Sequence, residues 1–211
     1  MPPLPSPSWR LPASLLLLSL VPLAAGAVRL LGLASGAAPT AENARFAAMP
    51  WPVATHIVGA TLFCVLGAFQ FDAALRRRSP VLHRSAGRVA AAGGMLAALS
   101  GLWMTVAYPI PEALQGELLY AVRVLVAVAM AVALGLSVRA ALRRRIAQHR
   151  AWMVRAYALG QGAGTQVLIL LPVTWLASAP TFLVRDVLMS SAWGLNLLVA
   201  EWIVRRHLPS R

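Results

Sequence analysis

Residues 117–145 read ELLYAVRVLVAVAMAVALGLSVRAALRRR, and this stretch decides the fold class. Most of its residues up to Leu142 are apolar, and three consecutive arginines follow. A helix of about 20 apolar residues crosses the ~30 Å hydrocarbon core of a bilayer, because each residue adds about 1.5 Å. Arginine is costly in that core and favourable at its edge. The stretch therefore predicts a transmembrane helix that ends at the headgroup region.

Five further apolar runs have a similar length. The predicted spans cover residues 11–34, 51–75, 85–108, 117–142, 151–171 and 184–204. None of them alternates polar and apolar residues, as the strands of a membrane barrel do. We therefore expect an all-α protein, a polytopic membrane bundle of about six helices in one domain, residues 11–205. A disordered, proline-rich N-terminal tail, residues 1–10, is expected before it, and a cytoplasmic tail, residues 206–211, after it.

The first apolar run allows two interpretations. Arg10, the core LLLLSLVPLAA and the small residues Ala25-Gly26-Ala27 resemble a cleavable signal peptide. Apolar character continues past Arg29 to Leu33, however, which favours an uncleaved first span. Both interpretations place the following segment on the outer side of the membrane.

The composition excludes several classes of protein. Of the 211 residues, 59% are hydrophobic and 12% are charged, and the mean hydropathy is +0.71. A soluble domain is about 45–50% apolar and about 25% charged, so neither a soluble globule nor a disordered chain fits. The single cysteine, Cys64, excludes a disulfide framework. The net charge of +13 comes from arginines clustered between apolar runs, which indicates contact with lipid headgroups and not with nucleic acid.

The arginine clusters also predict the orientation. They follow the second and fourth spans and the last span, whereas the other loops carry only Arg45 and Arg185. Positively charged short loops stay in the cytoplasm, so both termini are expected there, in the inner membrane of a bacterium. The clusters are expected to bind the bilayer through its anionic lipids, and oligomerisation is left open. The residues in this group are Arg76, Arg77, Arg78, Arg84, Arg143, Arg144, Arg145 and Arg150.

Two of the arginine-rich turns resemble each other. Residues 75–89 read LRRRSPVLHRSAGRV, and residues 142–157 read LRRRIAQHRAWMVRAY. A repeat of this kind predicts two similar helical hairpins, so that spans two to five form a four-helix core. Two carboxylates near the turns are expected to pair with arginines four residues on, Asp72 with Arg76 and Glu201 with Arg205.

The repeat places His83 and His149 at the inner ends of the third and fifth spans. Two neutral imidazoles that face inward on neighbouring helices can hold the iron of one b-type haem, or a metal. The alternative is an interfacial role, in which both imidazoles bind turn carbonyls or lipid phosphates. Glycines and alanines follow on both helices, and such small residues let helix backbones approach closely in lipid.

A second group of polar residues lies nearer the outer side. His56 and Arg123 each lie about two turns into their spans, at similar depth, and Gln166 is a candidate partner. An arginine at that depth costs about 2–3 kcal/mol unless it is paired, hydrated or extended to the headgroups. The three residues therefore predict a small outer-facing pocket that binds a quinone carbonyl or an anion. The alternative is that Arg123 reaches the outer headgroups.

The segment from His56 to Trp175 resembles a bacterial family of predicted membrane proteins, domain of unknown function 2306. The motifs that carry the resemblance are His56-x-x-Gly59, Gly67-Ala68-Phe69-Gln70-Phe71, Leu75-Arg76-Arg77-Arg78, Leu82-His83-Arg84-x-x-Gly87-Arg88-Val89, His149-Arg150-x-Trp152-Met153-x-Arg155-x-Tyr157-Ala158-Leu159, and the later Trp193-Gly194-Leu195-Asn196 with Glu201. The resemblance implies a multi-pass membrane fold, and it implies no particular activity.

Three functional hypotheses follow. The first is a membrane redox protein that binds one b-type haem or a quinone through His83 and His149. The second is a small-solute transporter or binding protein that uses His56 and Arg123, and the third is a structural or lipid-interacting module without redox chemistry. The sequence has no phosphate-binding loop, Gly-x-Ser-x-Gly or His-Glu-x-x-His motif, so it gives no sign of a kinase, hydrolase or zinc enzyme and predicts no metal site.

Overall fold

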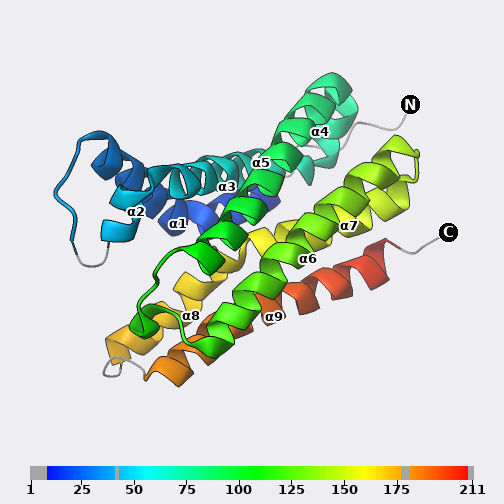
Figure 1. Ribbon diagram of the computed structural model, residues 1–211. Helices are drawn as coiled ribbons and strands as arrows, with labels where there is room; N and C mark the ends of the chain where they lie inside the picture. Colours follow the sequence, from blue (N-terminus) through cyan, green and yellow to red (C-terminus); the bar gives the residue numbers. More distant parts are fainter. Residues whose placement is uncertain (1–8, 41–42, 177–180, 209–211) are drawn as a thin grey trace.

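The computed structural model describes residues 9–40, 43–176 and 181–208, and these residues form helices and no strand (Figure 1). The elements are α1 (Arg10–Ala34), α2 (Ala44–Ala48), α3 (Pro50–Gln70), α4 (Ala73–Arg78), α5 (Pro80–Ala107), the 3-10 helix η1 (Glu112–Leu114), α6 (Glu117–Leu142), α7 (Ile146–Gly160), α8 (Gly162–Leu176) and α9 (Phe182–His207). Residues 1–8 of the predicted N-terminal tail lie outside the described residues, as do residues 209–211 of the C-terminal one.

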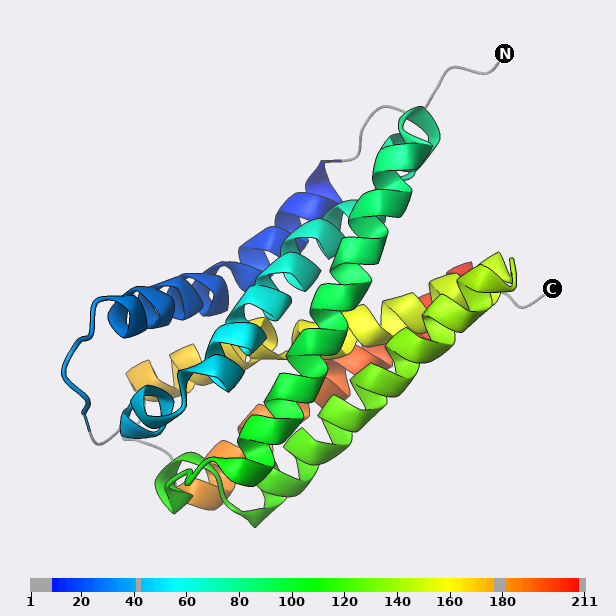
Figure 2. The ribbon, with the colours of Figure 1, turned by 45° about the horizontal axis from the view of Figure 1, so that its top comes forward.

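Six segments of the described chain are long and apolar enough to cross a membrane. They are α1, α3, α5, α6, the pair α7 and α8 taken together, and α9. This confirms the predicted all-α, polytopic helix bundle. Successive spans run in opposite directions, so the arginine-rich turns after α4 and α6 and the end of α9 lie at one end of the bundle (Figure 2). We call this the arginine-rich end and the opposite one the arginine-poor end.

The core lies where the sequence places it. Buried apolar side chains of α3, α5, α6 and α7 pack into one cluster, and α1 and α9 lie against its outside. The cluster consists of Phe63, Ala68, Ala90, Ala98, Met130, Ala133, Leu134, Ala156, Tyr157 and Leu159. The expected four-helix core of two hairpins is therefore present.

Two boundaries differ from the expected ones at the first arginine-rich turn. The second span ends at Gln70, because Asp72 begins a separate helix, α4, by accepting a hydrogen bond from the Ala74 amide at 2.7 Å. The predicted ion pair of Asp72 with Arg76 is wrong for the same reason, since the carboxylate caps the helix instead. The third span begins at Pro80, where proline fits the first helical turn.

The fifth span is broken in its middle. Helix α7 ends at Gly160 and α8 begins at Gly162, with Gln161 between them. Helix α7 packs against α6, α9 and α3, whereas α8 turns toward α1 and α9 (Figure 2). The expected end of this span at Pro172 is wrong, because α8 continues through that proline to Leu176.

Side chains of α9 compensate for the break. Trp193 Nε1 donates to the Leu159 carbonyl at 3.2 Å, and Asn196 Nδ2 donates to the Ala158 carbonyl at 3.0 Å. Backbone groups freed in the middle of a bilayer must find such partners, since no lipid atom replaces them. The two side chains therefore stabilise the break, because they give hydrogen-bond donors to carbonyls at the end of α7.

Helices α3 and α5 approach each other through glycine. A Cβ atom at Gly59 would lie 2.6 Å from the Gly93 carbonyl oxygen and 2.9 Å from the Ala97 amide nitrogen. Both of these atoms belong to the backbone and cannot rotate away. The small residues expected to let helices approach closely therefore do so at this crossing.

We predict that Gly59→Ala lowers the melting temperature of the detergent-purified protein, because the methyl group must separate two backbones at a cost of about 1–3 kcal/mol. Gly135→Ala is the matched control, since a Cβ atom there meets nothing within 4 Å. That control gains helix propensity of about 1 kcal/mol and should melt at or above the wild-type temperature. Equal melting temperatures for the two variants would contradict the tight crossing.

Candidate functional site

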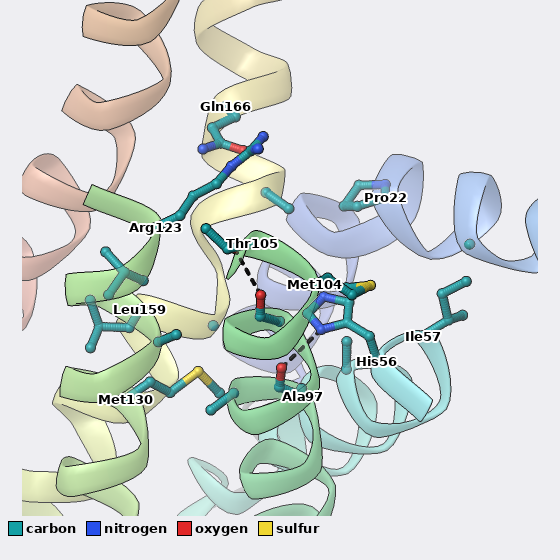
Figure 3. Close-up of a pocket in the computed structure, with 18 of the residues that line it drawn as sticks. Pro22, His56, Ile57, Ala97, Met104, Thr105, Arg123, Met130, Leu159 and Gln166 are labelled. Carbon is teal, nitrogen blue, oxygen red and sulfur yellow. Dashed lines mark hydrogen bonds between the residues drawn. The ribbon is translucent and has the colours of Figure 1, made fainter. Parts of the chain in front are cut away.

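A cavity of about 500 Å³ extends from the arginine-poor end toward the middle of the bundle. Its walls come from α1, α3 and the helices α5 to α9, and from the segments that connect them at the arginine-poor end. The cavity occupies the space that opens where α8 turns away from α6 and α3. Figure 3 shows that His56, Arg123 and Gln166, the three residues of the predicted pocket, lie around it.

His56 presents one nitrogen to this cavity. Its Nδ1 donates to the Ala97 carbonyl on α5 at 2.9 Å (Figure 3). A carbonyl only accepts, so the proton lies on Nδ1, and Nε2 carries the lone pair. A Cβ atom at Gly101 would lie 3.1 Å from the imidazole Cε1, so glycine leaves room for the ring. The remaining nitrogen is therefore an acceptor that a ligand can approach.

Arg123 carries its positive charge into the same cavity. Its Nη1 donates to Gln115 Oε1 at 2.5 Å, and Gln115 lies just before α6. The guanidinium lies beside the Gln166 amide, whose Nε2 donates to the Met189 carbonyl at 3.1 Å (Figure 3). The Arg123 side chain therefore extends toward the arginine-poor end of α6, and it lines the cavity there.

No carboxylate lines the described walls of the cavity, although Arg45 and Arg185 also line it. The acid whose charge interacts with that of Arg123 is Asp186, which is 3% exposed. Its carboxylate accepts hydrogen bonds from the amides of Gly116 at 3.4 Å and Leu119 at 3.1 Å, at the positive N-terminal end of α6. Asp186 thus serves the helix terminus and forms no ion pair with Arg123 within 4.0 Å. Arg123 therefore places a positive charge at the cavity without a carboxylate partner among the described residues within 4.0 Å.

Tyr108 lies at the arginine-poor end of the cavity. Its hydroxyl donates to the Met49 carbonyl at 2.6 Å, and its ring contacts Phe46 and Trp103 edge to face. Burial raises the pKa of the Tyr108 hydroxyl above its ordinary value. The hydroxyl therefore stays neutral at physiological pH and adds no negative charge to the cavity.

The inner part of the cavity is mainly apolar. Phe63, Met130, Leu159 and Trp193 contribute to its wall, and Gln161 adds an amide. A group of charged and polar atoms near the arginine-poor end thus continues into an apolar space. Such a combination suits an amphipathic ligand with one polar head.

His83 and His149 lie elsewhere, at the arginine-rich end, and neither lines this cavity. Each is the fourth residue of its helix, α5 or α7, as the repeat predicts. His149 Nδ1 lies 2.8 Å from Ser137 Oγ and 3.1 Å from the Ser137 carbonyl, and Ser137 belongs to α6 and not to the turn that follows it. His83 Nδ1 is buried without a hydrogen-bond partner. The described residues contain no group of three potential metal ligands.

The arginines of the two turns are mostly exposed at the arginine-rich end. Arg77, Arg78, Arg84, Arg143, Arg144, Arg145 and Arg150 are exposed, and Arg76 is half-buried. Glu201 does not pair with Arg205 as expected, because its carboxylate forms a two-pronged ion pair with Arg155 of α7, with one contact of 2.9 Å. This pair joins α7 to α9 near the same end.

Sequence reasoning missed four residues that shape the cavity. Ser19, Gln161, Trp193 and Asn196 hold the broken helix or line the space beside it. Trp193 and Asn196 belong to a motif that the sequence singled out without a role. The sequence signal that indicates a break is the glycine-rich segment Gly160–Gly164, because glycine weakens a helix.

Comparison with known proteins gives one match. A family model described as "Predicted membrane protein (DUF2306)" covers residues 53–204. The chain belongs to this family. His56, Arg123 and Gln166 all lie within the residues that match the DUF2306 family model. Helix α1, which contains Ser19, lies outside them. No curated protein and no solved structure matches the chain.

Proposed function

We propose that this membrane protein binds a small amphipathic anion, an organic carboxylate, in the cavity around Arg123, as a small-solute binding or transport protein. One observation gives this proposal its main support. The Arg123 guanidinium lies in a largely apolar cavity whose described walls carry no carboxylate.

The positive charge of Arg123 is costly in an apolar environment. An arginine held away from bulk water costs about 2–3 kcal/mol at the centre of a membrane helix unless it finds a partner. A bound carboxylate supplies the missing partner, and arginine binds carboxylates with two parallel hydrogen bonds. The cavity volume of about 500 Å³ fits a ligand of drug-like size. His56 Nε2 and the Gln166 amide add neutral polar contacts beside the charge.

The test compares two probes of nearly the same shape, the charged 2-naphthoate and the neutral 2-naphthamide. We predict that the detergent-purified protein binds 2-naphthoate at least about tenfold more tightly, since hydrogen bonds to a charged group contribute about 1.5–3 kcal/mol. Arg123→Gln should remove this preference, as measured by calorimetry or by ligand-induced thermal stabilisation. Arg139→Gln, in the last turn of the same helix, is the matched control and should keep it.

Three outcomes would overturn the anion proposal. They are equal binding of the two probes, absence of binding, and a preference that survives Arg123→Gln. Tighter binding of a neutral quinone such as menadione, independent of Arg123, would assign the cavity to a quinone instead.

We also propose that the arginine-rich end faces the cytoplasm of a bacterial cell, so that the cavity opens to the periplasm. The exposed arginines of the two turns support this orientation, because positively charged short loops stay inside. The same side chains would bind anionic lipid headgroups.

Cysteine labelling tests this orientation in intact cells. In a Cys64→Ser background, Glu112→Cys should react with a membrane-impermeant maleimide, because η1 lies at the arginine-poor end. Arg143→Cys should react only after the cells are permeabilised. Labelling of Arg143→Cys in intact cells would reverse the orientation.

A haem or quinone redox site at His83 and His149 is the second candidate function. His149 donates from Nδ1 toward the Ser137 carbonyl, as metal-bound histidines commonly do, and this leaves Nε2 for a ligand. His83 has a buried nitrogen without a partner, and its imidazole is near enough to interact electrostatically with His149.

The redox candidate predicts the Soret absorption band of a protein-bound haem when the purified protein is mixed with haem. His83→Ala and His149→Ala should each abolish the band, whereas His207→Ala at the end of α9 should not. A protein that stays colourless with added haem would end this candidate.

A further inference from the structure

The deep end of the cavity contains a buried amide that the anion site does not use. Gln161 is 4% exposed, lines the cavity, and lies at the break between α7 and α8. Its Nε2 has no hydrogen-bond partner. A buried amide nitrogen left in this way costs about 1–3 kcal/mol, so a residue that lines the cavity holds an unsatisfied donor.

Contacts on both sides fix the position of this amide. Ser19 Oγ of α1 lies 2.9 Å from Gln161 Oε1 and 2.9 Å from the Leu15 carbonyl, and its one proton is shared between these two acceptors. The oxygen end of the amide therefore faces α1. The Tyr157 hydroxyl donates to the Cys64 carbonyl at 2.8 Å. Its oxygen lies near the amide as a possible acceptor, but it does not meet the distance and angle of a hydrogen bond with Gln161 Nε2. The Gln161 backbone is held at the break, where the Ala158 and Leu159 carbonyls bind α9.

The amide also lies at a defined depth. Gln166, which lies beside Arg123, is five residues further along the chain, and a helix rises about 1.5 Å per residue, so the two glutamines are about 7.5 Å apart along α8. Apolar side chains such as Phe63, Met130 and Leu159 line the space at this depth. The cavity thus has a charged site near one end and the neutral Gln161 amide at the other.

We infer that Gln161 forms a second binding group of the cavity, which accepts a hydroxyl or carbonyl oxygen at the end of the ligand remote from its carboxylate. The inference rests on the proposed anion site and narrows its ligand. The ligand is an elongated, bipolar anion with a carboxylate at Arg123, an apolar body, and a neutral oxygen that binds Gln161 Nε2. Interrupted membrane helices commonly place such polar groups near the middle of the bilayer.

The experiment compares 2-naphthoate with 6-hydroxy-2-naphthoate, which carries a hydroxyl at the far end of the same rings. The wild-type protein should bind the hydroxylated probe about fivefold more tightly, the equivalent of one neutral hydrogen bond of about 1 kcal/mol. Gln161→Met fills a similar volume without the amide and should bind both probes equally. The unliganded melting temperature of each variant shows whether it is folded.

A matched variant and a second substitution complete the test. Gln166→Met lies beside Arg123, where the carboxylate of the ligand is expected to bind. This variant should weaken the binding of both probes by the same factor and keep the fivefold preference. If Gln161→Met does not fold, Gln161→Asn retains the amide but withdraws it by one methylene, and it should lose the preference.

The results separate the two proposals. Binding of 2-naphthoate that depends on Arg123, without a wild-type preference for the hydroxylated probe, overturns the role of Gln161 and leaves the anion site intact. A preference that survives Gln161→Met or Gln161→Asn overturns it too. If neither naphthoate binds, both proposals fail.

Discussion

The interruption of the fifth span at Gln161 is the constraint on which the cavity depends. Helix α7 fills the space between α6, α9 and α3 at the arginine-rich end, and α8 leaves the corresponding space at the other end. Two hydrogen bonds from α9, donated by Trp193 and Asn196, satisfy carbonyls freed at the break. A straight helix would pack against the same neighbours along its whole length and would close the space around Arg123.

The second feature that only the tertiary structure explains is the environment of the Arg123 charge. In the sequence it is an arginine inside an apolar run, and such a residue can simply extend to the headgroups. In the bundle it binds Gln115 and faces a cavity, while the buried acid Asp186 is engaged by the amides that begin α6. The positive charge is therefore retained next to an apolar space, which is the property that an amphipathic anion would recognise.

The two ends of the bundle have different characters. At the arginine-rich end, Arg155 and Glu201 form an ion pair between α7 and α9, and His149 binds Ser137 on the preceding helix. These contacts tie neighbouring helices together where the core is well filled. At the arginine-poor end, polar side chains line a cavity between the helices. The bundle thus combines a packed core with a cavity near its arginine-poor end.

Composition and spacing determined the helical membrane fold, the six spans, the four-helix core and the depth shared by His56 and Arg123. They could do so because the bilayer requires long apolar helices and excludes charge from their middle, and both requirements are local in sequence. The partners of Asp72 and Glu201 were predicted wrongly, since a helix cap and a residue on another helix compete with the nearest arginine. Only the tertiary structure decided the break at Gln161, because its stability comes from side chains of α9 and α1 that are distant in sequence.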